Sequence, residues 1–282
     1  MSNQPGVLYV VATPIGNLDD LSPRALLTLS EVSLIAAEDT RHSSKLLRHF
    51  GILTPVIAFH EHNEREKAAE LVAYLASGKS VALISDAGTP LVSDPGYRLV
   101  RATHAAGIRV VPLPGACAAI VALSASGLPS DRFAFEGFPP VKSAARRAWF
   151  EALAGEPRTL IVYESPHRIA ESLQDMAAVF GATREAVYAR ELTKQFETVR
   201  HATLGELARW VAEDANQQRG EIVVLVHGAA PAAAETSDDA ARILRILIKE
   251  LPVSQAAALA AEITGQKKNQ LYELALQLKQ AP

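Results

Sequence analysis

Short apolar runs alternate with amphipathic stretches along most of the chain. Val7–Ala12 (VLYVVA) is continuously apolar, as is typical of a strand buried on both faces. Ser22-Pro23 follows it and predicts a helix start, because serine caps a helix and proline fits its first turn. Since strand and helix signals keep alternating, the pattern indicates βα units, and hence a mostly parallel sheet covered by helices on both faces.

A boundary is expected between Pro112 and Pro129, after which the same alternation resumes. Before it, strands are predicted at 7–12, 34–37, 55–59, 81–85 and 108–112. Helices are predicted at 22–29, 41–50 and 94–107, and a further helix follows the third strand and ends at residue 77. After it, strands are predicted at 133–137, 158–163, 186–189, 196–203 and 221–226, and helices at 143–154, 166–180 and 204–215. The predicted fold is therefore α/β, with domains at 1–113 and 114–228, a linker at 229–237 and an all-α tail at 238–282.

Composition narrows the class of protein. Of the 282 residues, 49% are hydrophobic and 21% charged, which is typical of a globular chain. The net charge of −3 excludes a uniformly basic nucleic-acid coat, although a local basic patch is compatible with it. One cysteine excludes a disulfide framework and a cysteine-based zinc site, and no metal site is expected. Without a long apolar run or a signal-peptide pattern, we expect a soluble cytoplasmic protein.

Three loops that follow predicted strands combine small residues with prolines: Thr13–Asn17, Ser85–Gly96 and Pro112–Ala118. In open parallel sheets, ligands bind where loops leave the carboxyl ends of strands. None of the three loops has a phosphate-binding glycine pattern, so a cofactor held by backbone groups and small side chains is favoured over ordinary turns. A branched side chain at Gly115 is expected to fill the space of such a cofactor without disturbing the fold.

Basic residues lie beside aromatic ones in the second half of the chain. Lys142, Arg146 and Arg147 are near five rings, a combination that can hold RNA. The rings are Phe133, Phe135, Phe138, Trp149 and Phe150. A core strand followed by a solvated amphipathic helix explains the same pattern equally well.

The tail carries a second candidate for nucleic-acid binding. Gly265 is placed at a turn between two helical stretches, a spacing that suits a helix-turn-helix. Lys267 and Lys268 stand at the start of the second helix, where RNA would be met. A plain helical hairpin that packs on the body is the alternative.

Several motifs taken together resemble the ribosomal RNA small subunit methyltransferase I family, a member of the tetrapyrrole-methylase-like (class III) AdoMet-dependent methyltransferases. The motifs are Val11–Leu18, Ala37–Arg41, Ser85–Gly96, Tyr163–Arg168 and Arg190–Lys194. The resemblance spans 7–226, and the helical tail matches the family's C-terminal extension. It implies two α/β domains with S-adenosylmethionine in the cleft between them and a homodimer. It also implies 2′-O-methylation of a cytidine ribose in the decoding centre of 16S rRNA, within the small ribosomal subunit.

The resemblance also implies site residues. The S-adenosylmethionine contacts would be Pro14, Ile15, Gly16, Asp86, Ala87, Gly88, Thr89, Gly115, Ala116, Cys117, Ala118, Tyr163, Leu192, Glu221 and Ile222. Asp39 and Glu191 are candidate acceptors for the hydroxyl proton. Lys194 would orient the ribose or phosphate, or act as a base if burial lowered its pKa, and Arg41 would contact RNA.

Two alternatives stay open from the sequence. One is a methyltransferase acting on a tetrapyrrole, and the other is a non-catalytic RNA-binding factor of ribosome assembly. Ser85-Asp86-Ala87 stands where tetrapyrrole enzymes carry Gly-Asp-Pro, which argues against the small-molecule branch. Cys117 replaces a common serine in the third loop and is a milder departure.

Overall fold

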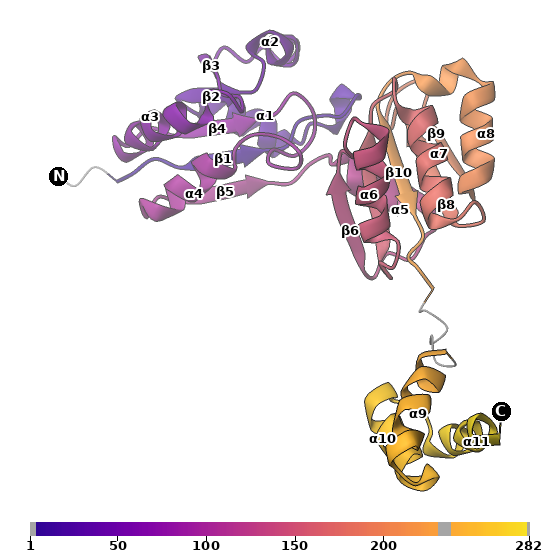
Figure 1. Cartoon of the computed structure of the whole chain (residues 1–282). Helices are drawn as coiled ribbons and strands as arrows, with labels where there is room; N and C mark the ends of the chain where they lie inside the picture. Colours follow the sequence, from indigo (N-terminus) through magenta and orange to yellow (C-terminus); the bar gives the residue numbers. More distant parts are fainter. Residues whose placement is uncertain (1–3, 231–237, 281–282) are drawn as a thin grey trace. The chain divides into compact units, whose positions relative to one another are not determined.

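A computed structural model describes residues 4–230 and 238–280, so most of the expected linker at 229–237 lies outside the described residues (Figure 1). The chain forms two compact units, 1–227 and 228–282, and each is treated by itself. Within the described ranges, no helix is long and apolar enough to cross a membrane.

The first sheet of unit 1–227 is entirely parallel, as predicted, with the order β3-β2-β4-β1-β5. Its strands are β1 (Leu8–Val11), β2 (Leu34–Ala37), β3 (Val56–Ala58), β4 (Val81–Ile84) and β5 (Val110–Leu113). Its helices are η1 (Leu18–Asp20), α1 (Pro23–Glu31), α2 (Thr40–His49), α3 (Glu64–Ala76) and α4 (Tyr97–Ala105). Two separate cores form, one with α1 and α2 and one with α3 and α4, so helices cover both faces.

Local sequence explains where these helices begin. The hydroxyl of Ser22 accepts a hydrogen bond from the Ala25 N–H at 3.1 Å, and Pro23 occupies the first position of α1. The carboxylate of Asp39 caps α2 by accepting from the Arg41 N–H at 2.8 Å. Each cap stands at the carboxyl edge of the sheet or close to it, and the loops that carry the site leave the same edge.

The second sheet has the order β6-β7-β10-β8-β9. Its strands are β6 (Phe133–Gly137), β7 (Thr159–Glu164), β8 (Glu185–Arg190), β9 (Thr198–Thr203) and β10 (Ile222–Val226). Its helices are α5 (Ala118–Ser126), α6 (Ser143–Leu153), α7 (Ile169–Phe180), α8 (Leu204–Glu213) and η2 (Ala215–Gln218).

The expectation that the second half would repeat the parallel arrangement is wrong. Only β6 and β7 pair in parallel, whereas β7–β10, β10–β8 and β8–β9 are antiparallel. Helices α6, α7 and α8 each still connect two strands of the same direction, since β10 runs between the parallel strands β7 and β8, and β8 between β9 and β10. Strands β6, β7 and β8 thus run in one direction, and β9 and β10 run in the other. The hydrophobic pattern of the sequence does not encode which strands become neighbours.

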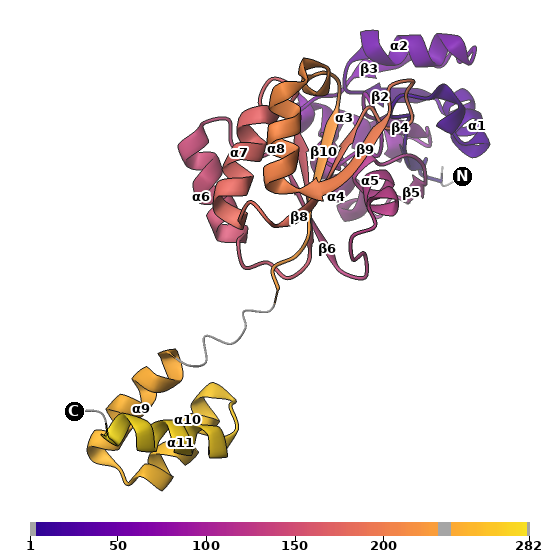
Figure 2. The ribbon, with the colours of Figure 1, turned by 90° about the vertical axis from the view of Figure 1, so that its right-hand side faces the viewer.

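The two faces of the second sheet are covered unequally. Helices α6, α7 and α8 lie side by side on one face and share a core built on Phe150, Met176 and Leu207 (Figure 2). On the other face, the one helix among the described residues is α5, which packs on β7, β9 and β10 together with loop residues such as Ile15 and Leu192. This unequal cover leaves apolar surface beside α5.

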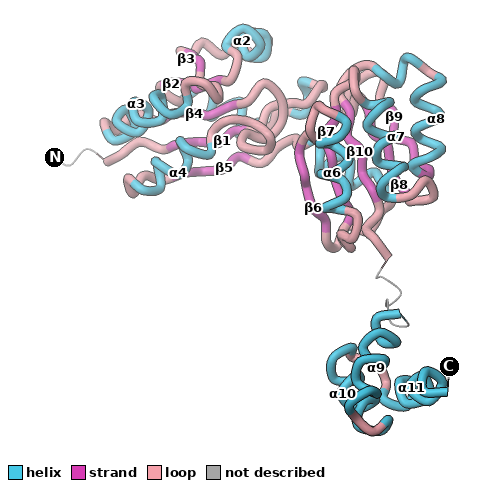
Figure 3. The backbone as a smooth tube through the Cα atoms, viewed as in Figure 1, coloured by secondary structure: helices cyan, strands magenta, loops and turns pink. Residues whose placement is uncertain are grey.

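The second unit is a bundle of three helices, α9 (Asp238–Glu250), α10 (Val253–Thr264) and α11 (Lys268–Gln280) (Figure 3). All three contribute to one small core that includes Leu244, Ala257 and Leu271. Gly265 ends α10 in the left-handed conformation (φ 69°), and its N–H donates to the Ala261 carbonyl. The predicted helix, turn and helix are therefore present, although the tail is not continuously helical.

Candidate functional site

Hydrogen bonds tie the three predicted loops together at the carboxyl edge of the first sheet. Thr13 and Gly88 exchange two backbone hydrogen bonds of 2.8 and 3.1 Å. The Thr89 hydroxyl donates to the Ala116 carbonyl at 3.0 Å. Gly88 has φ +81°, and a Cβ there would come within 3.2 Å of Ile15, so glycine is needed at this close approach. The loops thus form one rim.

The rim borders a first pocket of about 380 Å³, a volume within the range of roughly 300–1,000 Å³ typical of small-molecule sites. The predicted residues that line it are Ile15, Asp86, Ala87, Gly88, Thr89, Cys117, Ala118, Tyr163, Glu221 and Ile222. The other lining residues are Glu38, Val92, Ser93, Asp94, Phe138, Glu164, Ser165, Pro166, Gly220 and Val223. Val92, Ser93 and Asp94 belong to the predicted ligand loop Ser85–Gly96, whereas the remaining seven were not singled out as cofactor contacts. Most of these additional lining residues lie inside the motifs quoted above or next to them. The motifs therefore contain more of the pocket lining than the residues named individually as cofactor contacts.

A second pocket of about 250 Å³ adjoins the first. Ile15, Asp86, Ala87 and Glu221 line both pockets. Three groups that are or can be cationic line the second one, namely His42, Lys45 and Lys194. The predicted contacts Pro14 and Gly16 line this pocket rather than the first. The remaining predicted contacts, Gly115, Ala116 and Leu192, line neither.

Carboxylates concentrate in the first pocket. Burial and the neighbouring charges of Asp94 and Asp86 raise the pKa of Glu38 above its usual range. Burial, together with Asp86, also raises the pKa of Asp94. The backbone N–H of Asp39 donates to the Asp86 carboxylate at 3.0 Å and holds it in place. Because the acidic groups repel one another, the pocket suits a ligand that brings positive charge.

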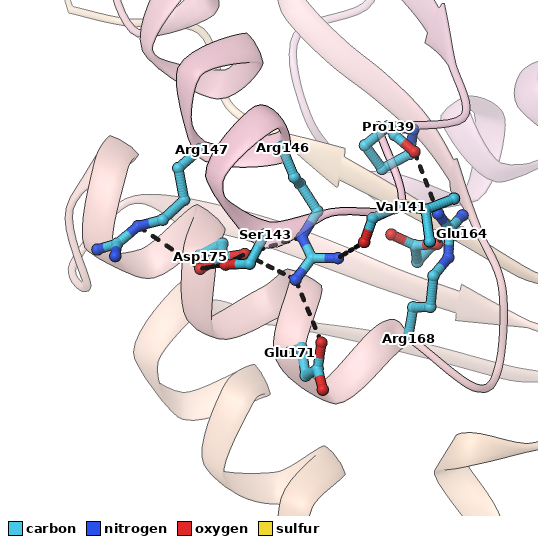
Figure 4. Close-up of polar contacts among 9 residues, drawn as sticks. All are labelled: Pro139, Val141, Ser143, Arg146, Arg147, Glu164, Arg168, Glu171 and Asp175. Atoms are coloured by element: carbon cyan, nitrogen blue, oxygen red, sulfur yellow. Dashed lines mark hydrogen bonds and ion pairs between the residues drawn. The ribbon is translucent and has the colours of Figure 1, made fainter.

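Two residues at the end of β7 supply polar groups to the pocket. Burial raises the pKa of Tyr163 further above neutrality, and its neutral hydroxyl accepts from the Ala119 N–H at 3.1 Å. Glu164 has a fully buried side chain whose Oε1 pairs with Arg168 at 2.7 Å, while its Oε2 has no partner among the described residues (Figure 4). A buried carboxylate oxygen without a partner is costly, so a ligand donor is expected to complete it.

Lys194 is part of a charge cluster between the loops of the two sheets. Its Nζ lies 2.8 Å from Glu191 and 2.9 Å from Glu221. Burial alone would lower the pKa of Lys194, but these two contacts outweigh burial and raise it. Gly16 and Gly220 make the approach possible, since a Cβ on either would lie 2.3 Å from the Lys194 or the Glu191 side chain. The condition under which Lys194 was predicted to act as a base, a pKa lowered by burial, is therefore not met, and the alternative of orienting the ribose or phosphate stays a prediction.

The two predicted proton acceptors are engaged elsewhere. Burial acts to raise the pKa of Glu191, yet its bonds to Lys194 and to the Glu221 N–H lower it overall. Hydrogen bonds from Arg41 lower the pKa of Asp39, which also caps α2. Neither residue lines either pocket. A carboxylate with a lowered pKa is a weak base, so both are better suited to holding the loops.

Gly115 is required for packing and not for space in the pocket. A Cβ on Gly115 would come within 2.8 Å of Ala12 Cβ, next to β1. Valine at this position would therefore push the loop away from the strand. The expectation that this substitution would leave the fold intact is wrong.

The predicted RNA contact by Arg146 is also wrong. Its side chain is buried, 2.7 Å from Asp175, and it donates to the Val141 carbonyl at 3.3 Å (Figure 4). Arg147 and Lys142 stay exposed, whereas Phe150 is in the core. Arg41, Lys267 and Lys268 are exposed as well. The basic and aromatic pattern of this region is thus mostly that of an amphipathic helix.

Comparisons with known proteins agree with this architecture. Residues 7–208 match the family described as Tetrapyrrole (Corrin/Porphyrin) Methylases, and residues 234–279 match the RsmI C-terminal HTH domain. The solved structure of the methyltransferase CobJ is similar with a TM-score of 0.60 at 20% identity, covering 80% of this chain and 95% of that one. Diphthine synthase is similar with a TM-score of 0.59 at 16% identity, covering 79% and 90%. These likenesses concern the fold.

Closer relatives span almost the whole chain. Ribosomal RNA small subunit methyltransferase I of Pseudomonas aeruginosa is 64% identical over 274 residues, 96% of this chain and 97% of the relative. The protein of the same name from Escherichia coli O157:H7 is 58% identical over 98% of this chain and 96% of the relative. The fold and the pocket between the two sheets define a class III methyltransferase of the tetrapyrrole-methylase type. Within that class, the chain belongs to the ribosomal RNA small subunit methyltransferase I family.

S-adenosylmethionine is the cofactor of this class, and the first pocket fits it. The unpaired Oε2 of Glu164 can accept from a cofactor hydroxyl or amine, and the acidic group of Glu38, Asp86 and Asp94 suits a cationic sulfonium. Cys117 and Ala118, at the start of α5, offer small side chains beside the rim. Within the described residues, no three His, Cys, Asp or Glu side chains gather in a way that could hold a metal ion.

Proposed function

We propose that this protein transfers a methyl group from S-adenosylmethionine to the ribose 2′-hydroxyl of a cytidine in the decoding centre of 16S rRNA. The observation that carries the proposal is identity of 52–64% to relatives named ribosomal RNA small subunit methyltransferase I, along both the α/β unit and the tail. Because ribosomal subunits are cytoplasmic, we infer that the protein acts there. The domain limits 1–113 and 114–228 are kept as part of this proposal, since the first sheet ends at Leu113.

The paired pockets support a two-substrate transfer. We place S-adenosylmethionine in the first pocket and the acceptor nucleotide in the second, whose cationic groups His42, Lys45 and Lys194 suit a phosphate. Asp86 and Glu221 line both pockets, so their carboxylates lie where the methyl donor and the hydroxyl would meet. Catalysis would consist mainly in aligning the hydroxyl oxygen, the methyl carbon and the sulfur.

Residue roles follow from what each side chain is free to do. Asp86 is the proposed acceptor of the hydroxyl proton, because this residue lines both pockets and its carboxylate is held by the Asp39 N–H. Lys194, which is fixed by Glu191, would orient the ribose or the adjoining phosphate. Asp39 would act indirectly, through the N-terminus of α2.

The test is methyl transfer from labelled S-adenosylmethionine to unmodified small ribosomal subunits, followed by mapping of the methylated nucleotide. Asp86→Asn should retain cofactor binding and lower the transfer rate by about 100-fold or more, the scale of general base catalysis. Asp39→Asn serves as the control and should stay within a few fold, because asparagine caps a helix about as well as aspartate. If Asp39 or Glu191 were the base instead, the large loss of transfer rate would appear in Asp39→Asn or in Glu191→Gln alone, and not in Asp86→Asn.

A homodimer is part of the proposal, and the face of the second sheet beside α5 is the proposed contact. Helix α5 is mostly apolar, and Ile120 on it is 49% exposed. Val199 on β9 and Phe133 on β6 are exposed at 40% and 38% beside it. Exposed apolar side chains on α5 and on the two edge strands of this sheet support the assignment of this face to a protein interface.

A further inference from the structure

The face of the first sheet that carries α3 and α4 has an arginine groove that neither pocket includes. This groove has a volume of about 580 Å³ and runs between the two helices. Alanines form its floor and sides, and its polar lining consists of Arg65, Arg98, Arg101 and the ring of Tyr97. None of the eight lining residues is acidic.

The arginines of the groove are mostly uncompensated. Within the described residues, Arg65 and Arg101 form no ion pair, and Arg98 approaches Glu64 at 3.8 Å with a side chain that is 62% exposed. Glu64 is itself occupied, since its Oε1 accepts from the N–H groups of Gly96 and Arg98. Three guanidinium groups that line one groove on a chain of net charge −3 are a localised site for anions.

The groove begins at the edge of the sheet that carries the site. Helices α3 and α4 follow the parallel strands β3 and β4, so both start at the carboxyl edge from which the loops of the first pocket leave. Ser93 and Asp94 line that pocket, and Tyr97 opens α4 three residues later. Tyr97 is 63% exposed at this end of the groove, while Arg101 lies about one helical turn beyond Arg98. A polymer entering the active site could therefore continue into the groove.

We propose that the arginine groove binds the sugar–phosphate backbone of single-stranded RNA next to the target nucleotide, with a base stacked on Tyr97. Guanidinium groups pair with phosphates in a bidentate manner, and an exposed aromatic ring beside them offers a stacking platform. Small alanines leave room for the chain to lie between the helices. This inference rests on the proposed function for the identity of the RNA, and it adds an RNA-binding surface outside the catalytic pockets.

The experiment compares four variants of the full-length protein, of which Tyr97→Phe keeps the ring and serves as the control for Tyr97→Ala. Arg65→Ala/Arg101→Ala removes the two unpaired charges of the groove, and Tyr97→Ala removes the ring. The matched control Arg24→Ala/Arg109→Ala removes two exposed, unpaired arginines outside the groove and gives the same net charge. Affinity for a fluorescent single-stranded RNA oligonucleotide is measured against salt, and kcat and KM are measured on unmodified small ribosomal subunits.

The groove double variant should bind the oligonucleotide about 10-fold more weakly or worse, with a salt slope lower by roughly 1.4, since each lost phosphate contact removes about 0.7. It should raise KM on subunits with kcat and cofactor affinity nearly unchanged. Tyr97→Ala should weaken binding about five-fold or more, and Tyr97→Phe should restore it. The control variant Arg24→Ala/Arg109→Ala should lose little affinity for the oligonucleotide.

Equal RNA affinity and salt slope in the groove variant and the control would overturn the proposal, and would indicate that the arginines serve another anionic partner. That failure is distinct from failure of the proposed function, which would appear as absence of a methylated ribose with the unmodified protein. If the wild type methylates subunits while the groove variants behave like the control, the proposed methyltransferase function stands and the RNA-binding role of the groove is refuted.

Discussion

Glu38 illustrates how a single residue of the site can work against folding. Its pKa is raised by burial and by Asp94 and Asp86, so the ionised form is disfavoured in the folded protein. A carboxyl with a raised pKa costs stability once the pH rises through its unfolded and then its folded value. Because the ionised Glu38 lowers the stability of the fold, its negative charge is consistent with a site that attracts a cationic cofactor.

We expect Glu38→Gln to weaken S-adenosylmethionine binding by about 5–10-fold at pH 8, because it removes one carboxylate from around the sulfonium. In the wild type, affinity should fall on acidification as Glu38 and Asp94 take up protons above their ordinary range, and the variant should show a shallower pH profile. Calorimetric titration between pH 5 and 8 measures both effects. The exposed Glu31→Gln is the control.

The same substitution should raise the free energy of unfolding at pH 8 and lose that advantage at acidic pH, since glutamine resembles the protonated carboxyl. Denaturant titrations at the two pH values would show this sign. A destabilised Glu38→Gln at pH 8 would mean that the charge is favourable in the fold, which contradicts the direction of its pKa.

Individual residues also mark how far sequence reasoning reaches. The family resemblance named ten of the first pocket's lining residues, and most of these ten lie in loops at strand ends, which meet at one edge of a parallel sheet. The pattern of basic residues beside aromatic ones gave Arg146 the wrong role, since an arginine on an amphipathic helix has the same pattern whether it faces solvent or a carboxylate on the next helix. Only the partner Asp175, distant in sequence, decides this, and such pairings are set by the packing of helices.

At the scale of elements, Arg146 and Arg168 fasten the segment that carries Phe138 to the body of the second sheet (Figure 4). Arg146 bonds to the Val141 carbonyl and to Asp175 on α7, and Arg168 bonds to the Pro139 carbonyl at 3.2 Å. The Phe138 ring contacts Tyr163 edge-on at 5.5 Å. Buried ion pairs of this kind fix one wall of the first pocket.

Arg146→Met should lower the free energy of unfolding by about 3–5 kcal/mol, because it leaves the largely buried Asp175 without its main partner. Arg147→Ala should change it by less than about 1 kcal/mol, since that contact with Asp175 is longer, at 3.6 Å, and its side chain is half exposed. Urea denaturation of the three proteins measures the difference. Equal losses in the two variants would mean that the buried pair carries no special weight.

The order of elements in the second sheet shows a limit of a different kind. The short connection between β8 and β9, residues 191–197, is compatible with an antiparallel pair, yet helices flank the other strands as in a parallel sheet. Strand β10 is continuously buried, which fits either a parallel or a mixed sheet. Local periodicity therefore predicted the strands, whereas their neighbours depend on long-range pairing that one sequence does not reveal.

For the whole molecule, charge is organised locally, and the two units divide the work. All residues lining the two pockets precede residue 228, where the second unit begins. Lys267 and Lys268 stand exposed at the N-terminus of α11, where cations oppose the helix dipole, and we propose that they contact RNA phosphates. The tail is thus expected to serve RNA recognition and not cofactor binding.

Deletion of 238–282 should leave S-adenosylmethionine affinity unchanged, because the α/β unit has its own cores. Methylation of small subunits should fall at least 10-fold, and Lys267→Ala/Lys268→Ala should reproduce much of this loss with a lower salt dependence. Light scattering should still find a dimer, since the proposed contact lies beside α5. A monomeric or insoluble truncation would instead make the tail a brace of the assembly, and a dimeric truncation with full activity would contradict both roles.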